Sequence, residues 1–316
     1  MEAGQKTTNV LNIVGKRYWF FLFSALIIIP GLISLLVPPG LKLGVDFTGG
    51  TLWELQFQSA PPTAAVRQVF TSFGHDALVQ TTGETSVLIR TKEIHADTPE
   101  KGAIEQALRE KFGDFKELRF ESVGPTVGSE VSSRATFAVA LASLGILLYL
   151  WYAFRRVPNS FRYGVCAIVA LLHDALVVLG IFSILGRVAG IEIDSLFVTA
   201  LLTVIGFSVH DTIVVFDRIR ENMIRHAGET FESVVNHSLT QTLGRSLSTS
   251  LTVIFTLTAL VLFGGITTRI FALTLLIGIV SGTYSSIFNA SQLLVVWENG
   301  ELGKLLRRQK PVGATT

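Results

Sequence analysis

Long apolar runs dominate the hydrophobic pattern of this chain. Six of them are predicted to form membrane-spanning helices, over residues 18–37, 135–154, 163–186, 195–216, 246–268 and 270–297. Each is about the 20 helical residues that a hydrocarbon core of about 30 Å requires. Four runs contain no Asp, Glu, Lys or Arg, and the other two are interrupted only by the pairs His173-Asp174 and His210-Asp211. The pattern predicts an α-helical membrane protein with six spans.

Residues 38–134, between the first two spans, follow shorter periods. The segments "GGTLWELQFQ" and "KELRFESV" alternate like strands, and "ALVQTT" and "TSVLIRT" flank a turn at Gly83-Glu84. The segments "PTAAVRQVFTSFG" and "TPEKGAIEQALREKFG" have helical spacing. The order β-α-β-β-α-β predicts an α+β ferredoxin-like domain outside the membrane. Residues 217–245 also repeat apolar side chains at helical spacing, which predicts an amphipathic segment that lies on the membrane surface or packs under the helices.

Composition agrees with a membrane protein. The chain is 49% hydrophobic and only 16% charged, whereas about a quarter of the residues are charged in soluble domains. A net charge of +2 gives no reason to expect nucleic acid as a partner, so partners are expected in the bilayer, including its lipids. Cys166 is the single cysteine, which excludes an internal disulfide and a thiolate metal site. We expect no metal and no catalytic residue.

Positive charge predicts the orientation. The first apolar run is longer than a secretory core of about 7–15 residues and lacks a small-x-small cleavage site, so we expect an uncleaved helix. One side of the membrane would carry Lys6, Lys16, Arg17, Arg155, Arg156, Arg162, Arg218, Arg220, Arg225, Arg245, Lys304, Arg307, Arg308 and Lys310. The short loops of the other side carry only Arg187 and Arg269. Residues 1–17 and 298–316 are therefore predicted to be cytoplasmic, and 38–134 extracytoplasmic.

Asp211 is the strongest candidate for chemistry. An ionisable side chain inside a bilayer costs free energy, so it normally faces protein or water and often marks an ion pathway. Burial would let this carboxyl hold and release a proton, and Arg218, about 10 Å further along the same helix face, could respond to that proton. His210, beside it, could add a titrating group. The structural alternative is that Asp211 only bonds a neighbouring helix.

Other polar positions in the spans are weaker candidates. His173 and Asp174 near mid-membrane suit a proton relay, because histidine titrates close to neutral pH, but a polar pair that bonds a neighbouring helix is an equal alternative. Gly278 and Gly282 predict close helix packing. Hydroxyls on one face of the fifth span could line a hydrated path or donate to a buried carboxylate, although packing is the simpler explanation; they are Ser248, Thr252 and Thr256.

Two glycine-rich junctions flank the extramembrane domain. In "LGVDFTGG", Gly49 and Gly50 permit a tight turn into the first strand, and Asp46 is expected to bond local backbone amides. In "VGPTVGSE", Gly124 and Gly128 lead into the second span. Glycines at both junctions predict that the domain moves as a body relative to the helices.

The chain resembles the SecF family, subunits of the SecD/SecF accessory complex of bacterial protein secretion. The resemblance rests on "LGVDFTGG", "VGPTVGSE", "LLHDALVVLG", "HDTIVVFDRIREN" and "QTLGRSLSTSLT", in this order, and it covers residues 40 to 297. It implies half of a resistance-nodulation-division bundle in the inner membrane, completed by SecD. It also implies the SecYEG translocon, YajC, YidC and preproteins as partners, with H⁺ as the coupling ion and no cofactor. The family's proposed proton-pathway residues map onto Asp211 and Arg218.

The resemblance is not complete. His210 stands where the family usually has asparagine, and Asn289 and Gln292 replace positions that are usually apolar or proline, so the local proton chemistry could differ. Three alternatives remain: a proton-coupled exporter half for small apolar molecules, a passive scaffold of the translocon, and an intramembrane aspartyl protease. The protease alternative lacks its Gly-x-Gly-Asp motif, since "SVH" precedes Asp211.

Overall fold

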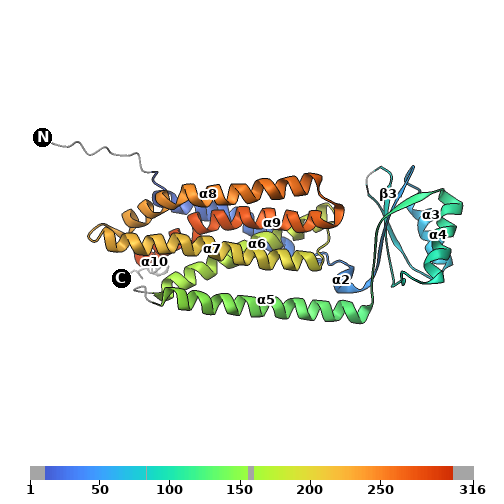
Figure 1. Ribbon diagram of the computed structural model, residues 1–316, viewed down its shortest axis with the longest axis horizontal. Helices are drawn as coiled ribbons and strands as arrows, with labels where there is room; N and C mark the ends of the chain where they lie inside the picture. The colour runs from blue at the N-terminus through green and yellow to red at the C-terminus, as the bar shows by residue number, and fades with distance from the viewer. Residues whose placement is uncertain (1–10, 83, 156–159, 302–316) are drawn as a thin grey trace, which may run out of the picture. The chain divides into compact units, whose positions relative to one another are not determined.

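The computed structural model describes residues 11–82, 84–155 and 160–301. It divides into two compact units, a helical bundle and a sheet domain formed by Lys42–Ala138 with Glu192–Ser195 (Figure 1). Part of the predicted positive charge lies outside the described residues, namely Lys6, Arg156, Lys304, Arg307, Arg308 and Lys310, and so do Gly83 and most of the predicted tail.

Among the described residues, six helical stretches are long and apolar enough to cross a membrane, as predicted. The first is α1 (Arg17–Leu36), preceded by a 3-10 turn at Val14–Lys16. Next come α5 (Pro125–Phe154), α6 (Ser160–Val188), α7 (Ser195–Arg225) and α8 (Phe231–Phe263). The last stretch joins α9 (Ile266–Ser285) through a π-helical turn, η2 (Ser286–Ala290), to α10 (Ser291–Glu298).

The segment 217–245 is not a separate surface helix. Instead α7 continues to Arg225, and α8 begins at Phe231, where the side chain of Thr230 accepts a hydrogen bond from the backbone of Ser233. The predicted apolar stripe lies on the first turns of α8 and is buried, at Val234, Val235 and Leu239. Of the two predicted placements, packing against the bundle is the correct one, because a continuous helix carries the stripe directly into the core.

The fifth span is shorter at its far end than predicted. Helix α8 ends at Phe263, and α9 begins at Ile266. The pair Gly264-Gly265 causes the break, since both residues adopt extended backbone conformations between the two helices. Glycine lowers helix propensity by about 1 kcal/mol relative to alanine, which favours a helix end at such a pair.

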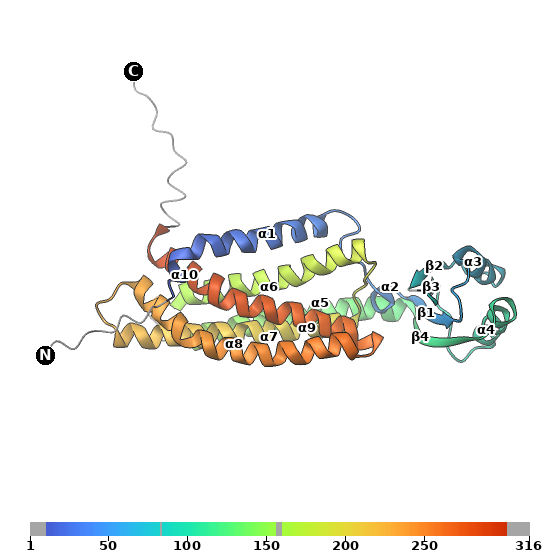
Figure 2. The same ribbon diagram turned by 90° about the horizontal axis from the view of Figure 1, so that it is seen from above.

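The sheet domain has the predicted β-α-β-β-α-β order. Its elements are β1 (Gly50–Phe57), α3 (Thr63–Ser72), β2 (Leu78–Thr82), β3 (Ser86–Thr91), α4 (Pro99–Phe112) and β4 (Phe115–Val123). The strand order is β2-β3-β1-β4, with all neighbours antiparallel. Helices α3 and α4 cover one face of the sheet (Figure 2). The core between them contains the large side chains of Trp53, Phe70, Ile89, Ile104 and Leu108. The ferredoxin-like prediction is confirmed.

The glycine junctions are packed against each other. Gly49 and Gly50 have positive φ angles of 71° and 108°, at the turn from a one-turn helix, α2 (Val45–Thr48), into β1. A Cβ atom on Gly128 would lie 2.8 Å from the backbone nitrogen of Gly49, and a Cβ on Gly124 would lie 3.1 Å from Glu93. These glycines thus permit close approach of backbone segments, whereas the predicted domain motion stays a prediction.

Candidate functional site

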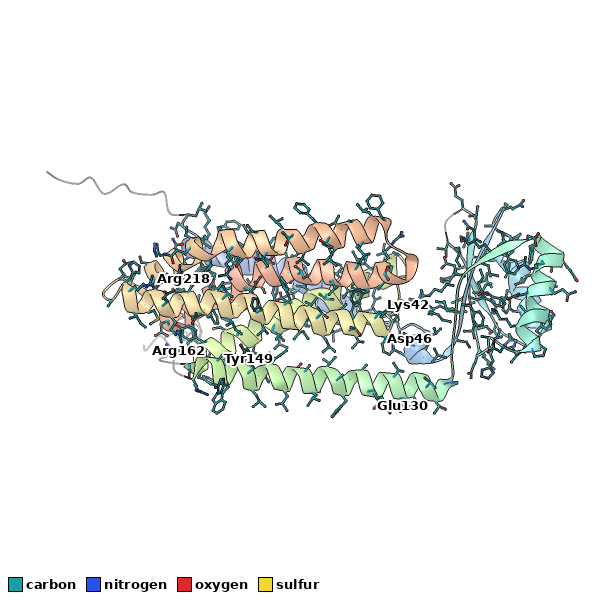
Figure 3. The ribbon with its side chains drawn as sticks, viewed as in Figure 1. Lys42, Asp46, Glu130, Tyr149, Arg162 and Arg218 are labelled. Atoms are coloured by element: carbon teal, nitrogen blue, oxygen red, sulfur yellow. The ribbon has the colours of Figure 1, made fainter. Side chains whose placement is uncertain are left out.

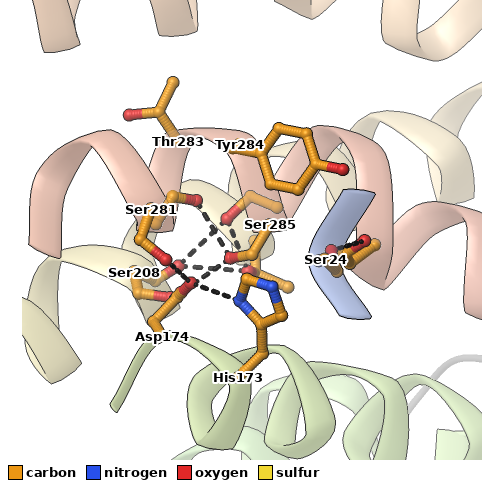
Figure 4. A network of polar contacts seen from close by, with 12 residues as sticks. Ser24, His173, Asp174, Ser208, Ser281, Thr283, Tyr284 and Ser285 are labelled. Carbon is orange, nitrogen blue, oxygen red and sulfur yellow. Dashed lines mark hydrogen bonds and ion pairs between the residues drawn. The ribbon is translucent and has the colours of Figure 1, made fainter. Parts of the chain in front are cut away.

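The carboxylate of Asp174 lies at the centre of a polar cluster between three helices, and it is completely buried. Its Oδ2 accepts hydrogen bonds from the hydroxyls of Ser208 and Ser285, at 2.5 and 2.6 Å. Its Oδ1 accepts from the hydroxyl of Ser281 at 2.7 Å and from Nδ1 of His173 at 3.0 Å (Figure 4). A carboxylate offers about four acceptor sites, so the donors around Asp174 satisfy it.

Helix geometry brings these donors together. Ser281 and Ser285 are four residues apart on α9 and therefore share a face, and Ser208 faces them from α7. Gly282 lies on the same contact, where a Cβ atom would be only 3.2 Å from the Cβ of Ser208. The close packing predicted for Gly282 is confirmed, and it is what allows two helices to share one carboxylate.

Asp211 has a different environment, although it follows Ser208 by three residues on the same helix. It is buried, with 5% of its surface exposed. Among the described residues, nothing hydrogen-bonds its Oδ2 atom. The next residue, Thr212, bonds the carbonyl of Ser208 at 3.0 Å and the hydroxyl of Ser286 at 2.8 Å. The bundle therefore contains one carboxylate, Asp174, whose oxygens are all hydrogen-bonded, and a second, Asp211, with an oxygen that has no partner in the described chain. Asp211 lies about one helical turn from Ser208, which donates to Asp174.

A π-helical turn lies beside this part of α7. Ser286 begins it, and the Ser286 hydroxyl contacts both Thr212 and the carbonyl of Ser208. Asn289, within the turn, bonds the hydroxyl of Ser24 on α1 at 2.8 Å. Single π-turns inside α-helices are frequent at functional sites, because the wider turn redirects backbone and side-chain groups. Asn289, one of the departures from the family pattern, thus ties the turn to α1.

The other predicted pathway residues are dispersed. Arg218 forms an ion pair with Glu221 at 2.5 Å, so in the described chain its carboxylate partner is Glu221 and not Asp211. His210 is exposed and lies on a different face of α7 from its buried neighbour Asp211. His173 joins Asp174, as above, and its Nε2 atom is buried without a partner among the described residues.

The hydroxyl stripe of α8 faces outward. Ser248, Thr252 and Thr256 are all exposed on this chain. The hydroxyl of Thr252 donates to the carbonyl of Thr249 at 2.7 Å, and that of Thr256 to the carbonyl of Thr252 at 3.0 Å. These threonine hydroxyls therefore hydrogen-bond to backbone carbonyls of their own helix. The carboxylate donors predicted on this stripe are instead serines of α7 and α9.

Asp46 does not bond the local amides as predicted. Its Oδ2 accepts from the backbone N–H of Ser195 at 2.8 Å and from the Ser195 hydroxyl at 2.5 Å. Thr48 does bond locally, but its hydroxyl donates to the carbonyls of Gly44 and Gly49. The local prediction was wrong for Asp46 because the start of α7, which is distant in sequence, places an N–H and a hydroxyl within reach of this carboxylate, and a negative charge is stabilised at a helix N-terminus.

Sequence reasoning missed the serines that surround Asp174. Ser208, Ser281 and Ser285 are isolated hydroxyls in apolar spans, and single serines in such spans are common. The available signal was the spacing of Ser281 and Ser285, four residues apart on a span already marked by Gly278 and Gly282. Across the described residues, no group of three or more His, Cys, Asp or Glu side chains could hold a metal ion.

Two family models match this chain. The family described as "Protein export membrane protein SecD/SecF, C-terminal" matches residues 103–300, which include both aspartates. The SecD/SecF GG motif matches residues 33–61, which include Asp46, Gly49 and Gly50. The chain belongs to the SecD/SecF family of protein-export membrane proteins. It is a multi-pass membrane protein.

Relatives within the SecD/SecF family cover nearly the whole chain. The "Protein translocase subunit SecF" of Thermobaculum terrenum is 57% identical over 97% of this chain and 100% of its own length. That of Anaerolinea thermophila is 50% identical over 96% of this chain. The crystal structure of SecDF from Thermus thermophilus is similar with a TM-score of 0.79 at 31% identity over 94% of this chain. This chain spans only 40% of that SecDF chain.

Proposed function

We propose that the chain is the SecF half of a SecD/SecF complex that uses the proton-motive force to promote preprotein translocation across the bacterial inner membrane. The names of the relatives support the translocation role. The 40% coverage of a SecDF chain supports SecD as the partner that supplies the remainder. SecYEG, YajC, YidC and preproteins are further proposed partners. H⁺ is the proposed coupling ion, and the proposal requires no cofactor and no enzymatic reaction.

The contrast between the two buried aspartates carries this proposal. Asp174 has four hydrogen-bond donors, which occupy both of its oxygens and tie α6 to α7 and α9. Asp211 is buried with an oxygen that lacks a hydrogen-bond partner in the described chain. A carboxylate oxygen without a hydrogen-bond partner is open to a proton, and ionisable groups inside membrane spans often mark proton pathways. Asp211 is therefore proposed as the proton carrier and Asp174 as the structural anchor.

His173 provides a second proposed station in the pathway. Its Nδ1 is hydrogen-bonded to Asp174, which fixes the orientation of the ring. Its Nε2 lacks a partner in the described chain and is the atom that would take the proton. In this pair the aspartate orients the ring of His173. Arg218, paired with Glu221, is proposed to act at the cytoplasmic end of the pathway, where the pair could open when Asp211 changes charge.

The exposed polar faces of two helices support pairing with a second membrane half. His210 is exposed on α7, together with Gly206 one turn earlier. The hydroxyl stripe of α8 is also polar and exposed. Polar groups that face lipid cost free energy, and small residues favour close helix contact. We therefore assign these faces to SecD, and the apolar exposed side chains of α1 and α5 to lipid.

The proposed orientation follows the positive charge. Arg162 and Arg218 lie toward the same end of the helical bundle (Figure 3), and we assign that end, with both termini, to the cytoplasm. The sheet domain then belongs to the opposite side of the membrane. A proton that crosses 100 mV releases about 2.3 kcal/mol, which is sufficient to bias a two-state motion of the domain.

The test is Asp211→Asn in proteoliposomes that contain SecD, SecYEG and this chain. We expect normal assembly and loss of the translocation that depends on the proton gradient. Asp217→Asn is the matched control, since Asp217 lies on the same helix but is exposed and paired with Arg220. If Asp211→Asn responds to the gradient as fully as the control does, the proton role is wrong, and a passive scaffold of the translocon becomes the better explanation.

A further inference from the structure

The loop between α6 and α7 belongs to the sheet domain. Its residues Glu192–Ser195 cluster with Lys42–Ala138 and not with the helical bundle. The backbone N–H of Gly44 donates to the carbonyl of Ile193 at 2.8 Å, and the N–H of Ile193 donates to the carbonyl of Lys42 at 2.9 Å. A parallel β-bridge joins Leu43 to Ile193. The loop is thus paired as a short strand with the first junction.

The backbones of Gly44 and Ile193 are so close that the pairing leaves no room for a side chain at Gly44. A Cβ atom on Gly44 would lie 2.9 Å from the carbonyl oxygen of Ile193, so a larger residue would displace the hydrogen-bonded segments. The side chain of Ile193 is itself buried, with 5% exposed. The pairing is therefore a packed part of the domain, and not a loose surface contact.

Two cations from different segments hold the acidic side chain of this loop. Glu192 forms ion pairs with Lys42 in the junction, at 3.4 Å, and with Arg90 on β3. Burial lowers the pKa of Arg90 to about 10, and the charge of Arg119 contributes. Burial also lowers the pKa of Lys42, with a further contribution from Arg90. The cations repel each other in a partly desolvated place, so Glu192 is the group that makes their proximity favourable.

The junction also caps the following helix. Asp46 on α2 accepts from the N–H and the hydroxyl of Ser195, the first residue of α7. A carboxylate at a helix N-terminus accepts hydrogen bonds there and interacts favourably with the helix dipole. Figure 3 labels Lys42 and Asp46 beside α2. Asp211 follows Ser195 on the same helix by 16 residues, or about 24 Å of continuous helix.

We propose that Glu192 and Asp46 are positioning residues that couple α7 to the sheet domain, so that a displacement of the helix that carries Asp211 moves the domain. The inference rests on the proposed proton-driven function. Glu192 connects α7 to β3 through Arg90, and Asp46 connects it to β1 through α2. We name this set of contacts the α7 clamp; it comprises Lys42, Asp46, Arg90, Glu192 and Ser195. The clamp stays closed during the cycle and transmits motion as a rigid joint.

The first test removes the clamp by Glu192→Ala and, separately, Asp46→Ala, in the complete chain reconstituted with SecD and SecYEG. We expect gradient-dependent translocation to fall by about fivefold or more, within the usual range of coupling free energies between sites. Assembly with SecD and gradient-independent translocation should be unchanged. Asp46→Asn should retain coupling, because asparagine caps a helix as well as aspartate does. Asp114→Ala, which removes an exposed ion pair with Arg109 in the same domain, is the matched control.

The second test adds a covalent lock through Leu43→Cys and Ile193→Cys, since β-bridged residues are within disulfide range. With Glu192 intact, the oxidised lock should leave gradient-dependent translocation unchanged. In the Glu192→Ala background, oxidation should restore it. If the lock blocks translocation with Glu192 intact, the joint must open and the proposed rigid clamp is wrong.

The two proposals can fail separately. If Asp211→Asn abolishes the gradient response while Glu192→Ala and Asp46→Ala retain it, only the clamp is refuted. If Asp211→Asn retains the response, the proton function itself is refuted. If Glu192→Ala loses assembly with SecD, the disulfide between Leu43→Cys and Ile193→Cys is introduced into this variant. If the clamp serves coupling, oxidation must then restore gradient-dependent translocation.

Discussion

The hydroxyl of Ser208 on α7 donates to the carboxylate of Asp174 on α6 at 2.5 Å. This bond fixes α7 one helical turn from Asp211, whose own carboxylate keeps an oxygen without a partner in the described chain. One aspartate thus positions the helix, and the other remains available for a proton. The two roles predict opposite effects of mutation on stability.

Asp174→Ala should destabilise the bundle strongly. It leaves three serine hydroxyls and an imidazole N–H without their carboxylate acceptor, although the Ser285 hydroxyl also bonds the carbonyl of Gly282, and a buried group without its partner costs about 1–3 kcal/mol. Because the hydroxyls can bond other acceptors, we expect a total loss of about 2–4 kcal/mol in the free energy of unfolding. Denaturant unfolding in detergent measures this. Asp174→Asn keeps one carbonyl acceptor and should cost less; equal losses would contradict the acceptor role.

Asp211→Asn should leave stability unchanged or raise it, by up to about 2 kcal/mol, since it replaces an incompletely satisfied buried acid by a neutral amide. The same unfolding measurement applies, with Asp217→Asn as the reference for an exposed position on the same helix. A loss as large as that of Asp174→Ala would mean that Asp211 is also a structural anchor, and the proton role would then lack its physical basis.

Gly278→Ala should separate α7 from α9. A Cβ atom at Gly278 would overlap the side chain of Val204, and overpacking of this kind costs about 1–3 kcal/mol. Gly145→Ala on α5 is the matched control, because no atom lies within 4 Å of a Cβ there. It should be neutral or slightly stabilising, as alanine is the better helix former. Equal thermal stability of the two variants in detergent would refute the close α7–α9 contact.

Local patterns were sufficient for the fold. The six spans depend on long apolar runs, and the β-α-β-β-α-β order depends on alternation and helical spacing within short segments, so each can be inferred from neighbouring residues. The predictions were less accurate where helices continue past the apolar run. The stripe at Val234 and Leu239 was correctly found to be amphipathic, but the continuity of α8 through it was not, since a polar surface segment and a helix extension have the same periodicity.

The candidate site was only partly predictable. Asp174 and Asp211 could be identified as candidates from the sequence alone, because each is a charged residue inside an apolar span. The sequence by itself determined that two carboxylates lie within membrane spans, because long apolar runs surround both. Helix spacing suggested Arg218 as a partner of Asp211, but a shared face does not decide which carboxylate a flexible arginine selects, and Glu221 is closer along the helix.

Only the tertiary structure decided which carboxylate is satisfied. The serine donors to Asp174 lie 34, 107 and 111 residues away in sequence, and the partner of Asp46 lies 149 residues away. Periodicity describes which face of an element a residue occupies, but it carries no information about which distant face packs against it. The sequence thus determined the elements and the buried charges, and packing between helices decided which charge is fixed and which helix the junction caps.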